Sequence, residues 1–238
     1  MLSVLLLLVA GGPETPPQDE AVRIIEKAVA AQGQPNTKGE VATRITGQWK
    51  VGNATNHYVS TFRPPNSLHV VQTWVVGERE ERAVHVFDGK SGWKLAAGKT
   101  SEFTSTELEC MKEMNARGGI LALENLTDPK QVRLTLLPEL KEKDEVYVGV
   151  RVQREDCPDT YLYFSKRTYF LCGVTGKKRT PDGESQDVFE YRSEYKEFGG
   201  KMFATRTTTK VGDVVRVEEI EKVEFIPVKD VQHLFAKP

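Results

Sequence analysis

The sequence predicts a mainly β protein of the α+β class, with a strongly curved antiparallel sheet, or incomplete β-barrel, of about 11–12 strands covered by an N-terminal helix and short lid helices. Three observations support this class. Apolar and polar residues alternate with a period of two along most of the chain, turn residues separate these segments, and few stretches show a helical period. No shift in composition marks a domain boundary, so we expect a single domain over residues 19–238.

The N-terminal residues resemble a signal for export. Met1 to Ala10 is an apolar run too short to span a bilayer, and the small residues Gly11 and Gly12 follow it, although no Lys or Arg precedes it. We expect a signal peptide over residues 1–12, a disordered spacer over 13–18, and a periplasmic or otherwise extracytoplasmic location in a bacterial cell envelope. The alternative is a frayed apolar terminus. No later segment resembles a transmembrane segment.

A helix is expected over residues 19–32, because apolar residues recur there on one face at helical spacing: Ala21, Ile24, Ile25, Ala28 and Val29. Asp19 can cap its start, and Gly33 ends it. Beyond Gly33 the period changes from 3.6 to 2, which marks the change from helix to strand.

Five strands follow, at about residues 41–51, 55–62, 67–76, 81–87 and 92–97. Turn residues separate them at Gly52-Asn53, at residues 63–66, at Gly77-Glu78 and at residues 88–92. Short strands joined by tight turns predict an antiparallel meander.

Two short helices are expected in the middle of the chain. Thr104 and Glu107 form a capping box at the start of the first, which ends near Gly118-Gly119. The apolar segment 120–126 predicts a second helix, which Asp128-Pro129 ends.

Strands then resume at about 131–137, 145–153, 160–165, 169–178, 186–198, 201–210 and 214–225. Gly199-Gly200 and Gly212-Asp213 are expected hairpin turns. A sheet this large should curl, and the predicted helices are the only elements available to cover its concave face.

Charge and cysteine content limit the function classes. The chain has 33 Lys and Arg against 34 Asp and Glu, so its net charge of −1 predicts no nucleic acid binding and no polybasic membrane patch. Cys110, Cys157 and Cys172 are an odd number, which leaves at least one thiol unpaired or intermolecular. A disulfide between Cys157 and Cys172 would need the loop at Pro158 to fold back.

The sequence contains no motif for catalysis. His85 and Asp88 are the nearest approach to a metal pair, and a surface strand residue before a turn explains them better. Cys110 lies beside Met111 in a predicted helix, where a small core residue is the simpler interpretation. We therefore expect no cofactor, no metal site and no enzymatic activity.

Apolar surface is the remaining functional signal. A long, curled sheet with few helices to fill it should leave a cavity between sheet and lid. For any one residue a place in the core is the simpler interpretation, but together these residues are candidates for ligand binding: Trp49, Phe62, Leu68, Val70, Trp74, Trp93, Leu108, Met111, Met114 and Leu123.

The chain resembles the periplasmic outer-membrane lipoprotein carriers, the LolA/LolB-like superfamily. The residues that carry the resemblance are the helix ending at Gln32-Gly33, the turn from Arg63 to Asn66, the hairpin from Phe87 to Trp93, the strand from Tyr161 to Ser165, and the terminus from Leu234 to Pro238. The family's turn is Arg-Pro-Asn, whereas this chain has a second proline, and Ser165 stands where the family often has Asp.

The resemblance implies an incomplete barrel closed by helices over a hydrophobic cavity that takes acyl chains. It also implies that Arg63 donates hydrogen bonds to carbonyls of the lid and helps to hold the empty cavity shut; a solvent-facing turn arginine is the alternative. The implied partner is a lipid acyl chain or a lipoprotein. A second hypothesis is that the protein is an envelope sensor or scaffold that uses the fold to bind a protein partner.

Overall fold

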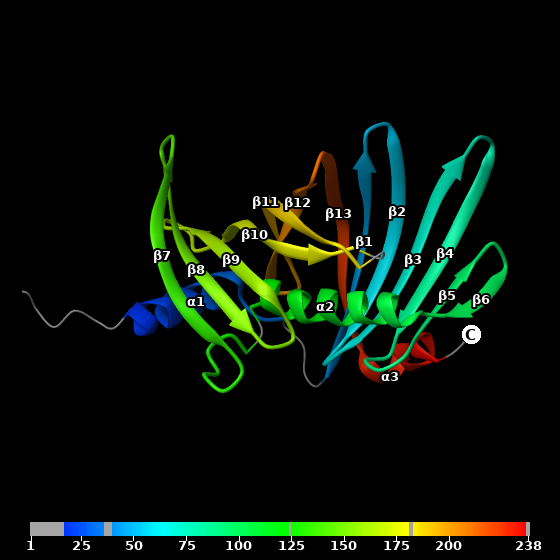
Figure 1. Ribbon diagram of the computed structural model, residues 1–238, viewed down its shortest axis with the longest axis horizontal. Coiled ribbons are helices and arrows are strands. Elements are labelled where there is room, and N and C mark those ends of the chain that lie inside the picture. Colours follow the sequence, from blue (N-terminus) through cyan, green and yellow to red (C-terminus); the bar gives the residue numbers. More distant parts are fainter. Residues whose placement is uncertain (1–16, 36–39, 124, 181–182, 237–238) are drawn as a thin grey trace, which may run out of the picture.

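The computed structural model describes residues 17–35, 40–123, 125–180 and 183–236, so the expected signal peptide and most of the expected spacer lie outside the described residues. One antiparallel sheet contains 13 strands in the order β6-β5-β4-β3-β2-β1-β13-β12-β11-β10-β9-β8-β7 (Figure 1). The sheet is strongly curved and open, which confirms the predicted fold class.

The N-terminal meander consists of β1 (Val41–Val51), β2 (Ala54–Arg63), β3 (Ser67–Val76), β4 (Arg79–Phe87), β5 (Gly92–Ala96) and β6 (Lys99–Glu102). The C-terminal meander consists of β7 (Arg133–Glu142), β8 (Glu145–Arg154), β9 (Cys157–Ser165), β10 (Leu171–Arg179), β11 (Ser185–Phe198), β12 (Lys201–Val211) and β13 (Val214–Pro227). The two meanders join where the first strand pairs with the last. The strand missing from the prediction is β6, because all four of its residues are exposed and carry no alternating pattern.

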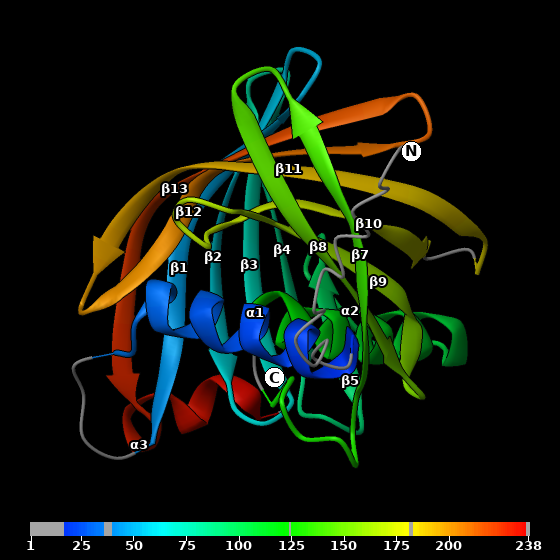
Figure 2. The same cartoon turned by 90° about the vertical axis from the view of Figure 1, so that its left-hand side faces the viewer.

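The helices are α1 (Pro17–Gln32), α2 (Ser105–Leu121), and the short pair α3 (Val228–Val231) and η1 (Gln232–Phe235). α2 joins the two edge strands β6 and β7, so the chain crosses the concave face through it. α1 lies beneath the arch of the sheet (Figure 2). The pair α3 and η1 covers the opposite face, where Val231 and Phe235 pack with Ala42 of β1.

The main core lies between α1, the C-terminal end of α2 and the concave face of β7–β10. Ile25 and Ala28 of α1 meet Ile120 of α2 and Val150 of β8 there, all fully buried. A bulge at Cys172 lets both Leu171 and Val174 of β10 face this core, although alternation alone would place them on opposite faces.

The structure corrects one expectation about local structure, settles the state of the cysteines and adds one helical segment. The separate helix over 120–126 is wrong: α2 continues past Gly118-Gly119 to Leu121, because burial of Ile120 outweighs the weak helix propensity of glycine. Leu123 and Asn125 then adopt left-handed backbone conformations, which end the helix. The pairing of Cys157 with Cys172, which the sequence left open, does not occur, since Cys110, Cys157 and Cys172 are all free thiols. The helix pair at 228–235 was not predicted.

Candidate functional site

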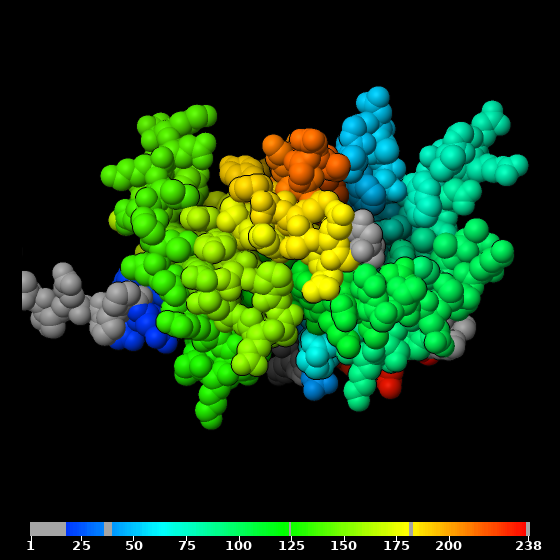
Figure 3. All heavy atoms as spheres, viewed as in Figure 1, coloured from blue at the N-terminus to red at the C-terminus, as the bar shows by residue number. Residues whose placement is uncertain are grey.

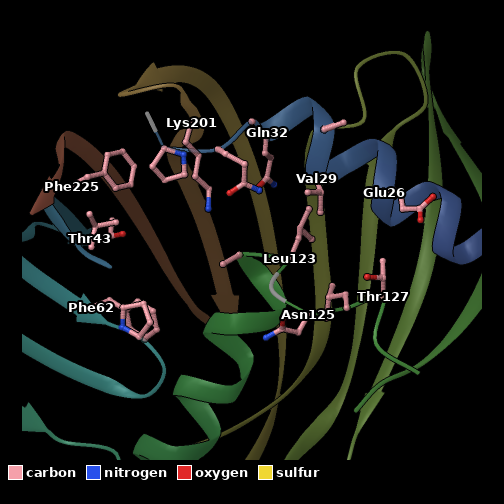
Figure 4. Close-up of a pocket in the computed structure, with 18 residues that line it drawn as sticks. Glu26, Val29, Gln32, Thr43, Phe62, Leu123, Asn125, Thr127, Lys201 and Phe225 are labelled. Atoms are coloured by element: carbon pink, nitrogen blue, oxygen red, sulfur yellow. The ribbon is translucent and has the colours of Figure 1, made fainter. Parts of the chain in front are cut away.

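A pocket of about 590 Å³ opens between α1, the loop after α2 and the central strands of the sheet (Figure 4). Phe62 of β2 and Phe225 of β13 form its wall on the sheet side, and Val29 and Leu123 face them from α1 and the loop. Lys201 is the cation among its lining residues. This volume falls within the range of about 300–1,000 Å³ that is typical of small-molecule sites.

A second pocket, of about 560 Å³, runs along α2. Ala116 and Gly119 of the helix line it opposite Pro65 and Phe87 of the sheet hairpins. The two pockets share three lining residues, so they adjoin beneath the lid: Phe62, Pro64 and Asn125.

The concave face continues from the pockets as rows of directly paired residues, which share one face because paired residues in an antiparallel sheet point the same way. The row at the first pocket is almost entirely apolar: Phe225, Thr43, Phe62, Leu68 and Phe87. The next row along the strands is mixed: Val223, Ile45, Ser60, Val70 and His85. The third row is Ile220, Gly47, Tyr58, Gln72 and Ala83.

The fourth row carries charge: Arg192, Thr207, Glu218, Trp49, Asn56, Trp74 and Glu81. The concave face therefore changes from apolar at the pocket to charged and aromatic farther along the same strands. Burial raises the pKa of Tyr58, and Glu218 raises it further, so this hydroxyl stays protonated.

The lid helix α2 is held mainly by polar contacts. Its start is fixed by a capping box at Thr104 and Glu107, as the sequence predicted. Glu107 also pairs with Lys94 of β5, and the hydrogen bond from Lys94 holds the pKa of that carboxyl below its usual range. Farther along, Glu113 accepts hydrogen bonds from the backbone N and the Nε of Arg179 at 2.9 and 3.3 Å. The space-filling view shows α2 beside the β9–β10 hairpin, across the middle of the side of the molecule that faces the viewer (Figure 3).

Solved structures share this architecture. A LolA superfamily protein from Nitrosomonas europaea matches with a TM-score of 0.59 and 14% identity, over 91% of this chain and 97% of that chain. An outer membrane lipoprotein-sorting protein domain from Vibrio parahaemolyticus matches with a TM-score of 0.57 and 10% identity, over 92% and 100%. A DUF1329 family protein from Desulfovibrio piger matches with a TM-score of 0.58 and 8% identity, over 93% and 98%.

The chain has a LolA-like fold. No protein-family model matches its sequence, and no curated protein matches it. Identities of 8–14% establish the fold and not the ligand. Within the described part of the chain, no helix is both long and apolar enough to cross a membrane.

The LolA-like fold brings several of the predicted ligand-binding residues together. Phe62 and Leu123 line the first pocket, and Phe62 also lines the second. Leu68 and Val70 lie on the same face in the first two rows, and Trp49 and Trp74 lie together in the fourth.

Other predicted residues lie elsewhere. Trp93 is on the convex face, because it pairs with Val86 and lines a small pocket beneath η1 with His69 and His233. Leu108 and Met111 are half-buried on α2, and Met114 is exposed. Alternation identified the concave positions within the other strands. It did not show which residues of β5 face the same side of the sheet as the concave residues of β4.

Among the described residues, Arg63 contacts Ser67 and Phe235 and not the lid carbonyls that the family resemblance implied. Its Nη2 donates to Ser67 Oγ at 2.8 Å, and its guanidinium lies over the ring of Phe235, 4.4 Å from the centroid. Since Phe62 faces the pocket, the next residue of the strand faces the opposite side, toward η1. Arg63 therefore lies against the C-terminal cover, on the face of the sheet away from the first pocket.

Sequence reasoning missed the contribution of the last strands. Phe225 and Lys201 line the first pocket, although they lie far from the lid in sequence. Both lie in segments that alternate, but only the pairing of β1 with β13 brings Phe225 beside Thr43 and Phe62, and a bridge to Gly33 places Lys201 at the end of α1. No local pattern in one sequence reports this pairing.

Proposed function

We propose that this protein is an exported, non-enzymatic carrier that binds the acyl chain of a lipid or lipoprotein between its concave sheet and its helical lid. The observation that carries the proposal is the pair of adjoining pockets, one between α1 and the loop after α2 and one along α2, which open onto the apolar row at Phe62 and Phe225. Burial of an acyl chain contributes about 0.8 kcal/mol per CH₂, so apolar contact alone can supply the affinity.

The shape of the site suits a flexible, narrow ligand. The first pocket is bounded by α1, by the loop after α2 and by strands from both meanders. α2 is anchored by ion pairs and hydrogen bonds, with little apolar packing near its start. Such contacts can break and re-form in water at small net cost, which favours a lid that opens to admit a chain.

An extracytoplasmic location belongs to the same proposal. The apolar run at residues 1–12 would direct export, and residues 19–238 would form the one carrier domain. The molecule would then hold a lipid in an aqueous compartment, where a free acyl chain is poorly soluble.

Binding of a neutral acyl probe tests the proposal. The purified chain is delipidated and titrated with a fluorescent monoacylglycerol. We expect saturable binding that Phe62→Asp or Leu123→Asp weakens at least tenfold, because a buried carboxylate in the pocket costs free energy. Val75→Asp is the matched control, since Val75 is 69% exposed on the convex face of β3. No saturable binding, or equal binding by all variants, contradicts the carrier proposal.

The alternative is a sensor or scaffold that binds a protein partner. The edge strands of the sheet are poorly suited to pair with a strand of such a partner. β6 is short and polar, and β7 has a bulge between Leu137 and Leu140, with Pro138 within it. Short strands, proline and bulges protect an edge against pairing with another chain. We therefore favour the pocket over strand addition.

A further inference from the structure

The charged end of the concave face forms a cluster that acyl binding alone does not explain. Glu190, Thr209 and Arg216 are cross-strand neighbours on β11, β12 and β13. In the adjacent row Arg192 is joined through Thr207 to Glu218. These side chains lie on the same face as Trp49, which pairs with Glu218.

The lid helix reaches the same cluster. Arg117 of α2 donates from Nη2 to Glu190 Oε1 at 3.2 Å and from Nη1 to the carbonyl of Lys177 at 3.2 Å. Arg192 donates from Nη2 to the other oxygen of Glu190 at 3.3 Å. One carboxylate thus serves two guanidinium groups, from the lid and from the sheet.

The cluster has more positive than negative charge. Four cationic side chains, Arg117, Lys178, Arg192 and Arg216, face two carboxylates, Glu190 and Glu218. Burial alone would raise the pKa of Glu190, but Arg192, Arg117 and Arg216 hold it below its usual range. Burial lowers the pKa of Lys178, and Arg216 lowers it further. A partly buried site with surplus positive charge favours an anion.

Two of the arginines also have unused donors. The Nε atoms of Arg192 and Arg216 are buried and have no hydrogen-bond partner among the described residues. The Oγ1 of Thr209, between them in the sheet, is buried and unpartnered as well. Arg216 approaches Glu218 only to 3.9 Å, beyond hydrogen-bond distance. A buried donor without an acceptor costs about 1–3 kcal/mol, which a bound oxyanion would recover.

We propose that Arg192 and Arg216 bind the oxyanion headgroup, a carboxylate or a phosphate, of an acidic lipid whose acyl chain lies along the concave face. The arginine fork suits both groups, because it can donate two parallel hydrogen bonds to either. This inference rests on the proposed function and names the class of lipid that the carrier would select.

The spacing of the rows is compatible with one such molecule. Trp49, in the arginine row, and Thr43, in the pocket row, are six residues apart on β1, which corresponds to about 20 Å at the usual rise of a strand. One leaflet of acyl chains spans about 15 Å, half the hydrocarbon thickness of a bilayer. Ile45, Val70 and Val223 lie on the path between the two rows.

The test compares lipids of equal chain length and different headgroups on the delipidated full-length chain. Hexadecanoic acid and hexadecanol are titrated by displacement of the neutral fluorescent probe, and phosphatidic acid is compared with inorganic phosphate by calorimetry. We expect the acid to bind at least tenfold more tightly than the alcohol. We also expect phosphatidic acid to bind at least a hundredfold more tightly than inorganic phosphate.

The variants assign this preference to the cluster. The double variant R192Q/R216Q should lose the preference for the acid and keep the affinity for the alcohol. R206Q is the matched control, because Arg206 lies on β12 between the two strands but pairs with Glu219 on the convex face. R216Q alone, at the more exposed position, gives the same comparison with a smaller effect if the double variant does not fold.

The outcomes separate the two proposals. Equal affinity for the acid and the alcohol, or an unchanged preference in R192Q/R216Q, overturns the headgroup site while acyl binding stands. Binding of inorganic phosphate as tight as that of phosphatidic acid also overturns it, in favour of a site for a free anion. Failure of every lipid to bind overturns both.

Discussion

Neighbouring residues in this protein have opposite roles because each strand presents alternate side chains to two different covers. Phe62 faces the pocket, and Arg63 faces the C-terminal helices. Leu68 pairs with Phe62 on the concave face, while His69 lines a convex pocket of about 230 Å³ beneath η1. In β2 and β3 we therefore expect a substitution at a concave position to affect the proposed ligand pocket, and one at a convex position to affect the docking of the C-terminal helices.

His69 predicts a dependence of stability on pH. Burial lowers the pKa of His69, and the nearby Arg44, Arg82 and His233 lower it further. The folded state therefore favours the neutral imidazole, so its contribution to stability is complete above the ordinary value of about 6.5 and is lost as the pH falls below it.

Urea unfolding at pH 8 and pH 5 measures this effect. We expect the wild type to lose more stability between these pH values than His69→Gln does. His57→Gln is the control, because His57 is an exposed histidine on the adjacent strand β2. An equal loss in the wild type and His69→Gln contradicts the prediction.

At the scale of elements, α2 shows how a helix can cover a sheet without a continuous apolar face. It begins at a capping box, makes ion pairs and hydrogen bonds along its length, and buries its first apolar side chain at Ile120, where it enters the core. The sequence identified its start, because the cap is a local motif. Its end depended on tertiary burial, which no local motif reports.

Removal of the cap should loosen the lid. Thr104→Ala should lower the free energy of unfolding by about 1 kcal/mol, the usual cost of losing such a residue, since Thr104 Oγ1 accepts from the backbone N of Glu107. Ser105→Ala, at the next position, is the control and should change stability by less than about 0.5 kcal/mol. The measurement is chemical denaturation, with release of the acyl probe followed in parallel.

At the scale of the whole molecule, the strands, their turns and the cover by helices followed from the sequence, but their closure into one sheet did not. Periodicity found twelve strands because each is a local pattern with turn residues at its ends, and it missed β6, which has no buried residue. The pairing of Thr43 with Phe225 joins residues from the two ends of the chain. The pocket depends on that pairing, so its walls could not be predicted completely.

Hydrogen exchange should reveal the same organisation. β1 and β13 are at the centre of the sheet, with strands on both sides, whereas β6 and β7 are at its edges. We expect the slowest amide exchange in β1 and β13 and fast exchange in β6, because central strands open only with global unfolding. Slower exchange in β6 than in β1 would contradict this description.

The junction of β1 with β13 has a consequence for biogenesis. A chain that emerges from its N-terminus presents β1 early, but the partner strand is synthesised almost last. Until then β1 remains an unpaired edge, and contacts this distant in sequence form slowly. During synthesis, the exposed edge of β1 can therefore pair with other polypeptides and cause aggregation. A holdase chaperone should raise the yield most when it acts before β13 has emerged.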